Sequence, residues 1–189
     1  MKVAFVVYDN MTCLDFIGIY DPLTRIHSMN FDLDFQWQIC ALTPKVTDDR
    51  GLSILADSVG EPLGEYDLLI VPGGAGAVSL RDEEPFIRWL TTASLVPLKA
   101  AVCTGSLLLA SANFLEGRMA TTHPGAWEML SNMGVETSSD RIVEDNGVIT
   151  AGGVTSAIDL GLYIVEKIMG KEIKDSIAKQ MDYPYIWKV

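Results

Sequence analysis

The sequence has few of the residues that bind metals or form disulfide frameworks. Its 189 residues include two histidines and three cysteines, Cys13, Cys40 and Cys103, and no Cys-x-x-Cys pair. An odd number of scattered cysteines argues against a disulfide framework, and so few potential ligands argue against a zinc site. We therefore expect no metal and no other cofactor, with the thiols reduced as they are in a cytoplasm.

Long apolar segments are also absent from the sequence. No apolar run approaches the roughly 20 residues that a membrane-spanning helix needs. The N-terminal stretch MKVAFVVY contains one lysine and a short apolar run. It lacks the longer apolar region and the small-residue cleavage site of a signal peptide. We expect a cytoplasmic protein that has no membrane partner.

Basic residues are also few relative to acidic ones. The chain has 14 lysines and arginines against 25 aspartates and glutamates, which gives a net charge of −11. An acidic surface repels phosphate backbones, so we do not expect a nucleic acid partner. The acidic residues are scattered along the chain, and we interpret them as a source of solubility in preference to an acidic docking tail.

What the chain does contain is typical of a globular protein. Apolar residues make up 49% of it and charged residues 21%. A chain of 189 residues is long enough to bury a stable hydrophobic core without disulfide bonds or a structural metal. No internal repeat, linker or low-complexity segment divides the sequence, so we expect a single domain over residues 1–189.

Short apolar runs without alternation predict strands that are buried on both faces, as in a parallel sheet. The predicted strands are Val3–Tyr8, Phe35–Leu42, Asp67–Val71, Lys99–Val102 and the shorter Met119–Thr121. Two hairpins are predicted from their turn residues. They are Lys45–Leu55, which turns at Asp49-Arg50-Gly51, and Ile142–Thr150, which turns at Asp145-Asn146-Gly147.

Helical spacing of apolar residues predicts the intervening elements. The predicted helices are Asp15–His27, Glu84–Leu95, Gly105–Ala112, Pro124–Met133 and Val154–Met169, the last closed by Gly170. Pro22 inside the first helix implies a kink or a later start, and the tail from Asp182 to Val189 is expected to be irregular. Strands alternating with helices predict a flavodoxin-like three-layer α/β/α sandwich with a mainly parallel central sheet.

Cys103 stands where a predicted strand runs directly into a predicted helix. This position puts a side chain at the carboxyl edge of the sheet, where open α/β sheets bind ligands. The helix N-terminus beside it should favour the thiolate and lower the pKa of the thiol. The alternative is a buried structural cysteine. We interpret Cys13 and Cys40, which lack this context, as structural.

Several segments of the chain resemble the ThiJ/PfpI superfamily, which shares its fold with class I glutamine amidotransferases. They are VAFVVYDNMTCLDFIGIYDPL, DLLIVPGGAG, VCTGSLLLASANFLEGRMATTH and TAGGVTSAIDLGL. Within the superfamily the sequence is most similar to isonitrile hydratase-like members and to the amidotransferase-like domains of AraC-type regulators. The resemblance implies a homodimer with active sites near the subunit interface.

The resemblance assigns a nucleophile and an acid. Cys103 matches the nucleophile, and Asp15 matches an aspartate that the hydratase-like branch carries in the loop after the first strand. A carboxyl group beside a thiolate should have a raised pKa and could move protons to and from substrate. Its alternative role is to cap the following helix. Asp21 is the other nearby candidate for the acid, but no motif supports it.

Three further positions are candidates for binding substrate. The N–H groups of Gly74, in the turn Pro72-Gly73-Gly74, and of Thr104 could stabilise negative charge on substrate, although a plain tight turn is the alternative. The Thr104 hydroxyl could orient water or substrate. The resemblance also implies that His123 lies near the nucleophile. The alternative interpretation is a histidine that has a structural role and whose ring nitrogens are hydrogen-bonded. His27 is expected to face solvent.

The leading hypothesis is a cysteine-dependent hydratase of small molecules. It would convert an isonitrile to an N-substituted formamide through a covalent thioimidate on Cys103. Thr104 stands where protease-like members carry histidine, which argues against a protease or amidase. One alternative is glyoxalase- or deglycase-like chemistry on small aldehydes. The other is a non-enzymatic sensor of oxidative stress that uses Cys103. We expect no DNA-binding domain within these residues.

Overall fold

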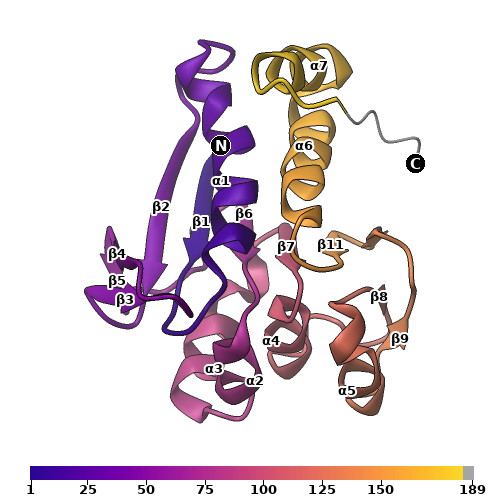
Figure 1. Ribbon diagram of the computed structural model, residues 1–189. Helices are drawn as coiled ribbons and strands as arrows, with labels where there is room; N and C mark the ends of the chain where they lie inside the picture. The colour runs from indigo at the N-terminus through magenta and orange to yellow at the C-terminus, as the bar shows by residue number, and fades with distance from the viewer. Residues whose placement is uncertain (185–189) are drawn as a thin grey trace.

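The fold is built around a seven-stranded, mostly parallel sheet. The computed structural model describes residues 1–184 (Figure 1). The strand order is β10-β11-β7-β6-β1-β2-β5, and β10 alone in this sheet runs antiparallel to its neighbour. The strands are β1 (Lys2–Val6), β2 (Gln36–Ala41), β5 (Ser58–Val59), β6 (Leu68–Val71), β7 (Leu98–Val102), β10 (Ile142–Asp145) and β11 (Val148–Ala151).

Helices cover both faces of this sheet. On one face, α1 lies beside α6, and α7 packs against α6 (Figure 1). The connections β6–α2–α3–β7 and β7–α4–β11 run in the opposite direction along the sheet, which puts their helices on the other face. The bounds are α1 (Cys13–Ser28), α2 (Ala75–Leu80), α3 (Glu84–Thr91), α4 (Gly105–Ser111), α5 (Trp127–Asn132), α6 (Ser156–Met169) and α7 (Lys171–Gln180). The predicted three-layer α/β/α fold is therefore confirmed.

Two small sheets flank the main one. One is the predicted hairpin of β3 (Lys45–Thr47) and β4 (Ser53–Leu55), and the other pairs β8 (Met119–Ala120) with β9 (Glu136–Thr137). The hairpin lies against the loop after β1, because Asn10 N–H donates to Thr47 O and Asp49 N–H donates to Met11 O. This contact brings acidic residues of the hairpin next to the start of α1.

Some element boundaries differ from the sequence-based prediction. The elements β5, α2, β9 and α7 were not predicted, since each is short or lacks a clear apolar stripe. The predicted helix Glu84–Leu95 ends in a 3₁₀ turn, and the one predicted over Pro124–Met133 begins with a 3₁₀ turn. Of the tail predicted to be irregular, residues 185–189 lie outside the described part of the chain.

The helix α1 continues through Pro22, so the prediction of a later start is wrong. Its close contact with α6 accounts for this. A Cβ atom on Gly18 would lie 2.6 Å from the Ala157 Cβ, and one on Gly161 would lie 2.9 Å from the Pro22 Cγ. Small residues thus let the two helices approach closely, and Pro22 packs into the space above Gly161. This packing holds the first turn of α1, which carries Asp15, against the sheet.

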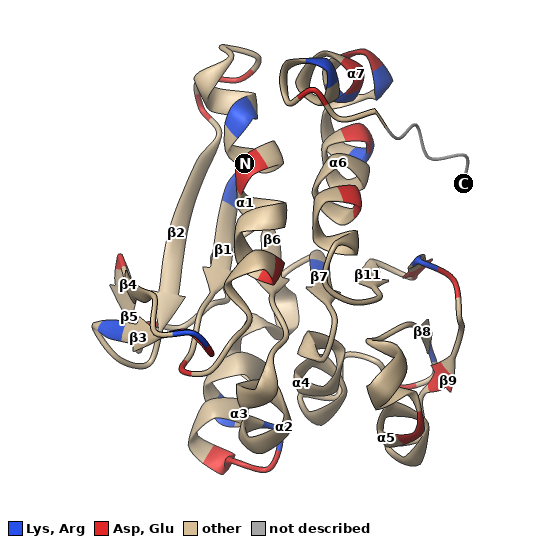
Figure 2. Cartoon of the chain, in the orientation of Figure 1, with Lys and Arg blue, Asp and Glu red and all other residues tan. Residues whose placement is uncertain are grey.

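The central strands are nearly free of exposed surface. All four residues of β6, all five of β7 and all four of β11 are buried. Apart from Lys99 and Thr150 these residues are apolar, as expected for strands covered on both faces. Acidic residues are spread over several elements, and both signs of charge are interleaved on α7 (Figure 2). No helix within residues 1–184 has the length and apolarity to cross a membrane.

Candidate active site

Cys103 occupies a sharp turn between β7 and α4. Its φ of 57° lies in the left-handed region, which costs a non-glycine residue energy and persists only when surrounding contacts hold it. The Cys103 N–H donates to the carbonyls of Ala151 (2.9 Å) and Gly152 (2.8 Å). Its carbonyl accepts hydrogen bonds from the hydroxyls of Thr122 (2.9 Å) and Ser106 (3.1 Å). The backbone of the predicted nucleophile is therefore fixed on both sides.

Glycine at position 105 is required by the same turn. A Cβ atom there would lie 2.4 Å from the Val71 carbonyl oxygen and 2.6 Å from that of Pro72. The start of α4 therefore rests directly against the end of β6. This contact brings the Cys103 side chain next to the turn Pro72-Gly73-Gly74, as expected for adjacent parallel strands.

Asp15 reaches the same place from the first turn of α1. Its side chain is fully buried, and its Oδ2 accepts a hydrogen bond from the Gly73 N–H at 3.1 Å. Its Oδ1 is buried without a hydrogen-bond partner of normal geometry among the described residues. A Cβ atom on Gly73 would lie 2.7 Å from the Cys103 Cβ and 2.9 Å from the Asp15 Oδ2. Glycine at position 73 thus leaves the carboxyl and the thiol facing one another.

Burial raises the pKa of Asp15 from its ordinary value to about 7. Hydrogen bonding to Cys103 and to the Gly73 N–H opposes this rise in pKa, and negative charge on Asp49 adds to it. The charged form is disfavoured because no cation from the described part of the chain compensates it in this buried place. The direction of the shift agrees with the prediction, and it leaves Asp15 able to hold a proton near neutral pH.

The expected lowering of the Cys103 pKa does not occur. Burial raises the pKa of the thiol to about 12, and negative charge on Asp15 adds to the rise. Hydrogen bonds from the backbone and side chain of Thr104 lower it, but by less. The sequence-based argument relied on the dipole of α4, and a helix of seven residues does not offset the loss of solvent around a thiol that is 6% exposed.

Asp15 and Cys103 therefore titrate as a pair. Each negative charge disfavours the other, so the pair retains one proton over a wide range of pH. When Asp15 holds that proton, its charge no longer raises the pKa of Cys103. Between the two pKa values the proton lies mainly on the Cys103 sulfur, because the pKa of the thiol is the higher one. The form with a thiolate beside a neutral carboxylic acid carries the same number of protons and differs only by transfer of that proton from sulfur to Asp15.

Thr104 and Gly74 form two hydrogen bonds with each other. The Gly74 N–H donates to the Thr104 Oγ1 at 2.8 Å, and the Thr104 hydroxyl donates to the Gly74 carbonyl at 2.9 Å. The prediction that the Gly74 N–H is free to face a reacting atom is therefore wrong for this structure. The Gly73 N–H is likewise engaged, by Asp15. The N–H of Thr104, which interacts with the Cys103 sulfur, is the remaining candidate donor of the predicted set.

His123 does not contact the thiol in the described structure. Its side chain is exposed, and its Nδ1 accepts a hydrogen bond from the Gly125 N–H at 3.1 Å. The ring lies over Gly153, where a Cβ atom would come within 2.2 Å of it. These contacts correspond to the structural reading of His123, as a cap for the 3₁₀ turn before α5. The neighbouring Thr122 is the residue that reaches the Cys103 backbone.

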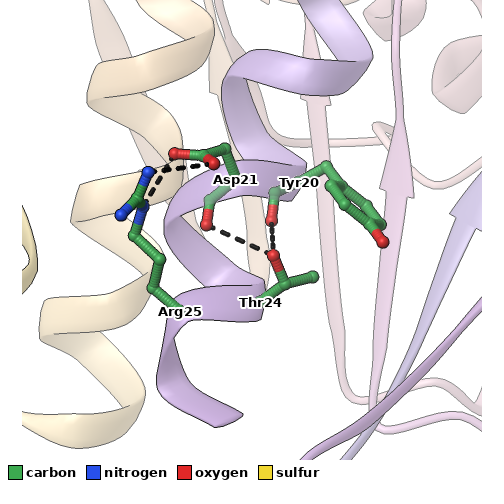
Figure 3. A network of polar contacts seen from close by, with 4 residues as sticks. All are labelled: Tyr20, Asp21, Thr24 and Arg25. Atoms are coloured by element: carbon green, nitrogen blue, oxygen red, sulfur yellow. Dashed lines mark hydrogen bonds and ion pairs between the residues drawn. The ribbon is translucent and has the colours of Figure 1, made fainter. Parts of the chain in front are cut away.

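Asp21 is engaged away from the site. Its carboxylate forms an ion pair with Arg25 one turn further along α1, with distances of 2.8 and 3.1 Å (Figure 3). The Thr24 hydroxyl bonds back to the carbonyls of Tyr20 and Asp21 in the same turn. This network stabilises the helix around Pro22, and it leaves Asp15 as the acid that faces Cys103.

The remaining predicted residues have ordinary structural environments, with one exception. Cys40 is buried in β2, and Cys13 is partly exposed at the start of α1. His27 is partly buried and packs edge-to-face on Trp37, with ring centroids 5.9 Å apart. The expectation that His27 faces solvent is therefore wrong, because Trp37 on β2 covers it.

Tyr8 belongs to the site and was not predicted. It is buried, and its hydroxyl donates to the Pro72 carbonyl at 2.6 Å. Burial raises the pKa of Tyr8 well above its usual range, with smaller contributions from the charges of Asp15 and Cys103. In the sequence Tyr8 is the last residue of an apolar run. The signal that could have separated it from the core is its hydroxyl at the carboxyl end of a parallel strand.

Comparisons with known proteins agree with this geometry. The DJ-1/PfpI family matches residues 1–167. An isonitrile hydratase of Pseudomonas putida is 30% identical over 184 residues, covering 97% of this chain and 78% of that protein. An HTH-type transcriptional regulator of Pseudomonas aeruginosa is 28% identical over 184 residues, but this chain spans only 53% of its length.

Solved structures include close matches to the whole fold. A ThiJ/PfpI family protein from Pseudomonas syringae superposes with a TM-score of 0.87 at 27% identity, covering 100% of this chain and 77% of that one. An oxidised DJ-1 from Toxoplasma gondii superposes with a TM-score of 0.81 at 26% identity, covering 97% of this chain and 99% of that one.

Proposed function

The chain belongs to the DJ-1/PfpI family, and from this premise we propose that it is a cysteine-dependent hydratase that converts an isonitrile to an N-substituted formamide. The observation that carries the proposal is the pairing of a buried carboxyl, Asp15, with the thiol of Cys103. The similarity to an isonitrile hydratase supports the choice of substrate class. Both steps of the reaction need one group that attacks carbon and one that carries a proton.

The first step uses the thiolate form of the pair. The Cys103 sulfur attacks the terminal carbon of the isonitrile, and a carbon–sulfur bond forms. Negative charge that develops on this carbon is neutralised when Asp15 delivers its proton there. The product of this step is a thioimidate, in which the former isonitrile carbon carries one hydrogen and remains bound to Cys103. Asp15 is left as a carboxylate.

The second step returns both groups to their starting state. Asp15 accepts a proton from water as the water oxygen bonds to the thioimidate carbon, and that proton passes to the substrate nitrogen. The resulting adduct then loses its hydroxyl proton to Asp15 while the carbon–sulfur bond breaks. The sulfur leaves as thiolate, and the released product is the N-substituted formamide. One water is consumed and no cofactor takes part.

The other predicted residues take supporting roles in this proposal. The Thr104 N–H stabilises charge at the sulfur, and the Thr104 hydroxyl holds Gly74 in place. Gly73 positions Asp15 through its N–H. We propose no role in catalysis for His123, whose Nδ1 accepts from Gly125.

The test is a direct assay of a simple alkyl isonitrile beside methylglyoxal. We expect the isonitrile to be hydrated, and Cys103→Ala to lose this activity while Cys13→Ala retains it. Preference for methylglyoxal would instead favour the glyoxalase-like alternative, which uses the same thiol on a carbonyl. An active Cys103→Ala variant would refute the assignment of the nucleophile.

A sensor of oxidative stress is the second candidate. It is supported by the similarity to DJ-1 proteins, one of which was solved in an oxidised form. The raised pKa of the Cys103 thiol slows oxidation, because the thiolate is the form that peroxide oxidises. The same raised pKa acts on the hydratase reaction, but only that reaction also uses the proton held by Asp15. Mass spectrometry after mild peroxide would support this candidate if Cys103 were oxidised selectively. Equal oxidation of Cys13 and Cys103 would count against it.

We also propose that residues 1–189 act as a single-domain homodimer in the cytoplasm, without nucleic acid or membrane partners. On α1, Leu14 and Ile17 flank Asp15 in sequence and are 43% and 42% exposed, which gives an apolar surface beside the site. We expect Ile17→Glu to shift the protein toward monomer in sedimentation. Leu95→Glu, at an exposed position on another element, serves as the matched control.

A further inference from the structure

A pocket lies at the carboxyl edge of the sheet, the edge that also carries Cys103. It has a volume of about 400 Å³. The end of β1, the connection between β2 and β3, and the helices α2 and α3 enclose it. Cys103, Asp15 and Thr104 are not among its lining residues. This pocket is therefore distinct from the candidate active site.

The topology explains why a pocket forms here. The chain leaves β1 through α1 toward β2, and it leaves β6 through α2 and α3 toward β7, in the opposite direction along the sheet. The neighbouring strands β1 and β6 thus form the switch point at which α/β proteins bind ligands. Tyr8 follows β1 and donates its hydroxyl to the carbonyl of Pro72, which follows β6. Its side chain thus links the ends of the two strands, and Tyr8 is one of the residues that line the pocket.

The walls of the pocket are apolar and firmly held. Its apolar lining residues are Val7, Leu42, Val46, Leu80, Pro85 and Phe86. The rings of Tyr8 and Phe86 pack edge-to-face with centroids 5.6 Å apart. A Cβ atom on Gly76 would lie 2.2 Å from the Asp9 carbonyl oxygen, so α2 rests directly on the loop after β1. The pocket is preformed, as binding sites for small molecules usually are.

Two carboxylates lie in the lining of this apolar pocket. They belong to Asp9 and Glu83, and neither forms an ion pair with any residue in the range 1–184. The Asp9 Oδ1 accepts from the Thr47 N–H at 2.7 Å, which orients the carboxylate and leaves Oδ2 for a ligand. Within residues 1–184, no lysine, arginine or histidine lines the pocket. Its charge is therefore negative and uncompensated.

We propose that this pocket binds a small organic ammonium ion. The hydrocarbon group of the ion packs against Phe86 and Tyr8, and its charged nitrogen is directed toward Asp9 and Glu83. An anionic ligand of the same size would be repelled by both carboxylates. A neutral ligand would gain the apolar contacts only.

Isothermal titration with benzylammonium tests the proposal, and the Cys103→Ala protein is measured beside the wild type. We expect benzylammonium to bind both proteins alike, and benzyl alcohol and benzoate to bind at least tenfold more weakly. Binding should weaken as salt is added, because the carboxylates are exposed to solvent. Since no turnover is measured, failure of the hydratase proposal leaves this test intact. Equal binding of the alcohol, or no binding of the ammonium ion, would overturn the proposal.

Variants test the location of the site. Glu83→Gln and Asp9→Asn should each weaken benzylammonium binding about threefold to fivefold, as expected for solvent-exposed ion pairs. Asn at position 9 still accepts from the Thr47 N–H and so keeps the loop in place. Ser79→Phe, which fills the pocket from α2, should abolish binding. The exposed Glu116→Gln serves as control, and binding that is unaffected in Asp9→Asn and Glu83→Gln would contradict the assignment.

Discussion

The carboxyl group of Asp15 faces the thiol of Cys103 across the space that a side chain on Gly73 would fill. A residue of the first helix and a residue at the end of β7 thus meet through a glycine at the end of β6. The pKa of each group is raised by burial, and the charge of Asp15 raises that of Cys103 further. Most of the predictions below follow from this contact.

Asp15→Asn should make the Cys103 thiol more reactive while it lowers the rate of turnover. Removing the negative charge lowers the pKa of Cys103, because that charge is among the causes of its rise. The thiol should therefore react faster with iodoacetamide at pH 8. Hydration of an isonitrile should fall by about a hundredfold or more, since the proton donor is gone. An alkylation rate equal to that of the wild type would show that the two groups are not coupled.

The contribution of Asp15 to stability should fall as pH rises toward neutrality. Folding raises the pKa of Asp15 from 3.8 to about 7, so between these values the folded protein binds more protons than the unfolded chain. The contribution of Asp15 is therefore fully present below pH ~4 and is lost as the pH rises through ~7. The loss is on the order of 4 kcal/mol, at 1.36 kcal/mol per pKa unit.

Urea unfolding of the wild type and of Asp15→Asn at several pH values measures this contribution. The difference between the two proteins should change by that amount from pH 4 to pH 7.5, with the wild type losing stability relative to the variant. A constant difference across this range would mean that folding does not perturb the carboxyl of Asp15.

Gly73→Ala should damage both the fold and the reaction. The added Cβ would lie 2.6 Å from the Thr104 backbone nitrogen and 2.7 Å from the Cys103 Cβ. Either the turn after β6 or the turn between β7 and α4 must therefore move. Such overpacking costs about 1–3 kcal/mol, measurable by thermal unfolding, and turnover should fall further than stability alone explains. Gly152→Ala is the matched control, because the nearest atom to its Cβ would be 3.8 Å away.

Thr104→Val should weaken the turn after β6. The variant removes a hydroxyl that both donates to and accepts from Gly74, which leaves two backbone groups unpaired at a cost of about 1–3 kcal/mol. Thr104→Ser keeps the hydroxyl and should restore most of the unfolding free energy. If Val and Ser at this position proved equally stable, the paired bond with Gly74 would contribute nothing.

Much of this arrangement could be predicted from the sequence. Apolar runs identify β1, β6 and, after Lys99, β7. The order of elements puts Cys103 and the turn after Val71 at one edge of the sheet. The identity of Asp15 as the acid followed from a resemblance. It is consistent with the structure, where Asp21 pairs with Arg25 instead.

The sequence was a poor guide where tertiary packing decides. The pKa of Cys103 depends on how deeply other segments bury the turn between β7 and α4, and no local sequence pattern determines that burial. The N–H of Gly74 was expected to be free, but its engagement by Thr104 depends on the distance between two loops. Pro22 argued against an uninterrupted helix, yet contact between α1 and α6 through Gly161 accommodates it. Tyr8 ends an apolar run, so only its hydroxyl distinguished it from a core residue, and the partner of that hydroxyl, Pro72, lies after another strand.

Intact-protein mass spectrometry during a single turnover tests the proposed reaction most directly. When the protein is mixed with an excess of an alkyl isonitrile and quenched within milliseconds to seconds, Cys103 should carry an adduct equal in mass to the whole isonitrile. The adduct should disappear as the N-alkylformamide accumulates. Formamide formed without any adduct on Cys103, or an adduct confined to Cys13 or Cys40, would contradict the account.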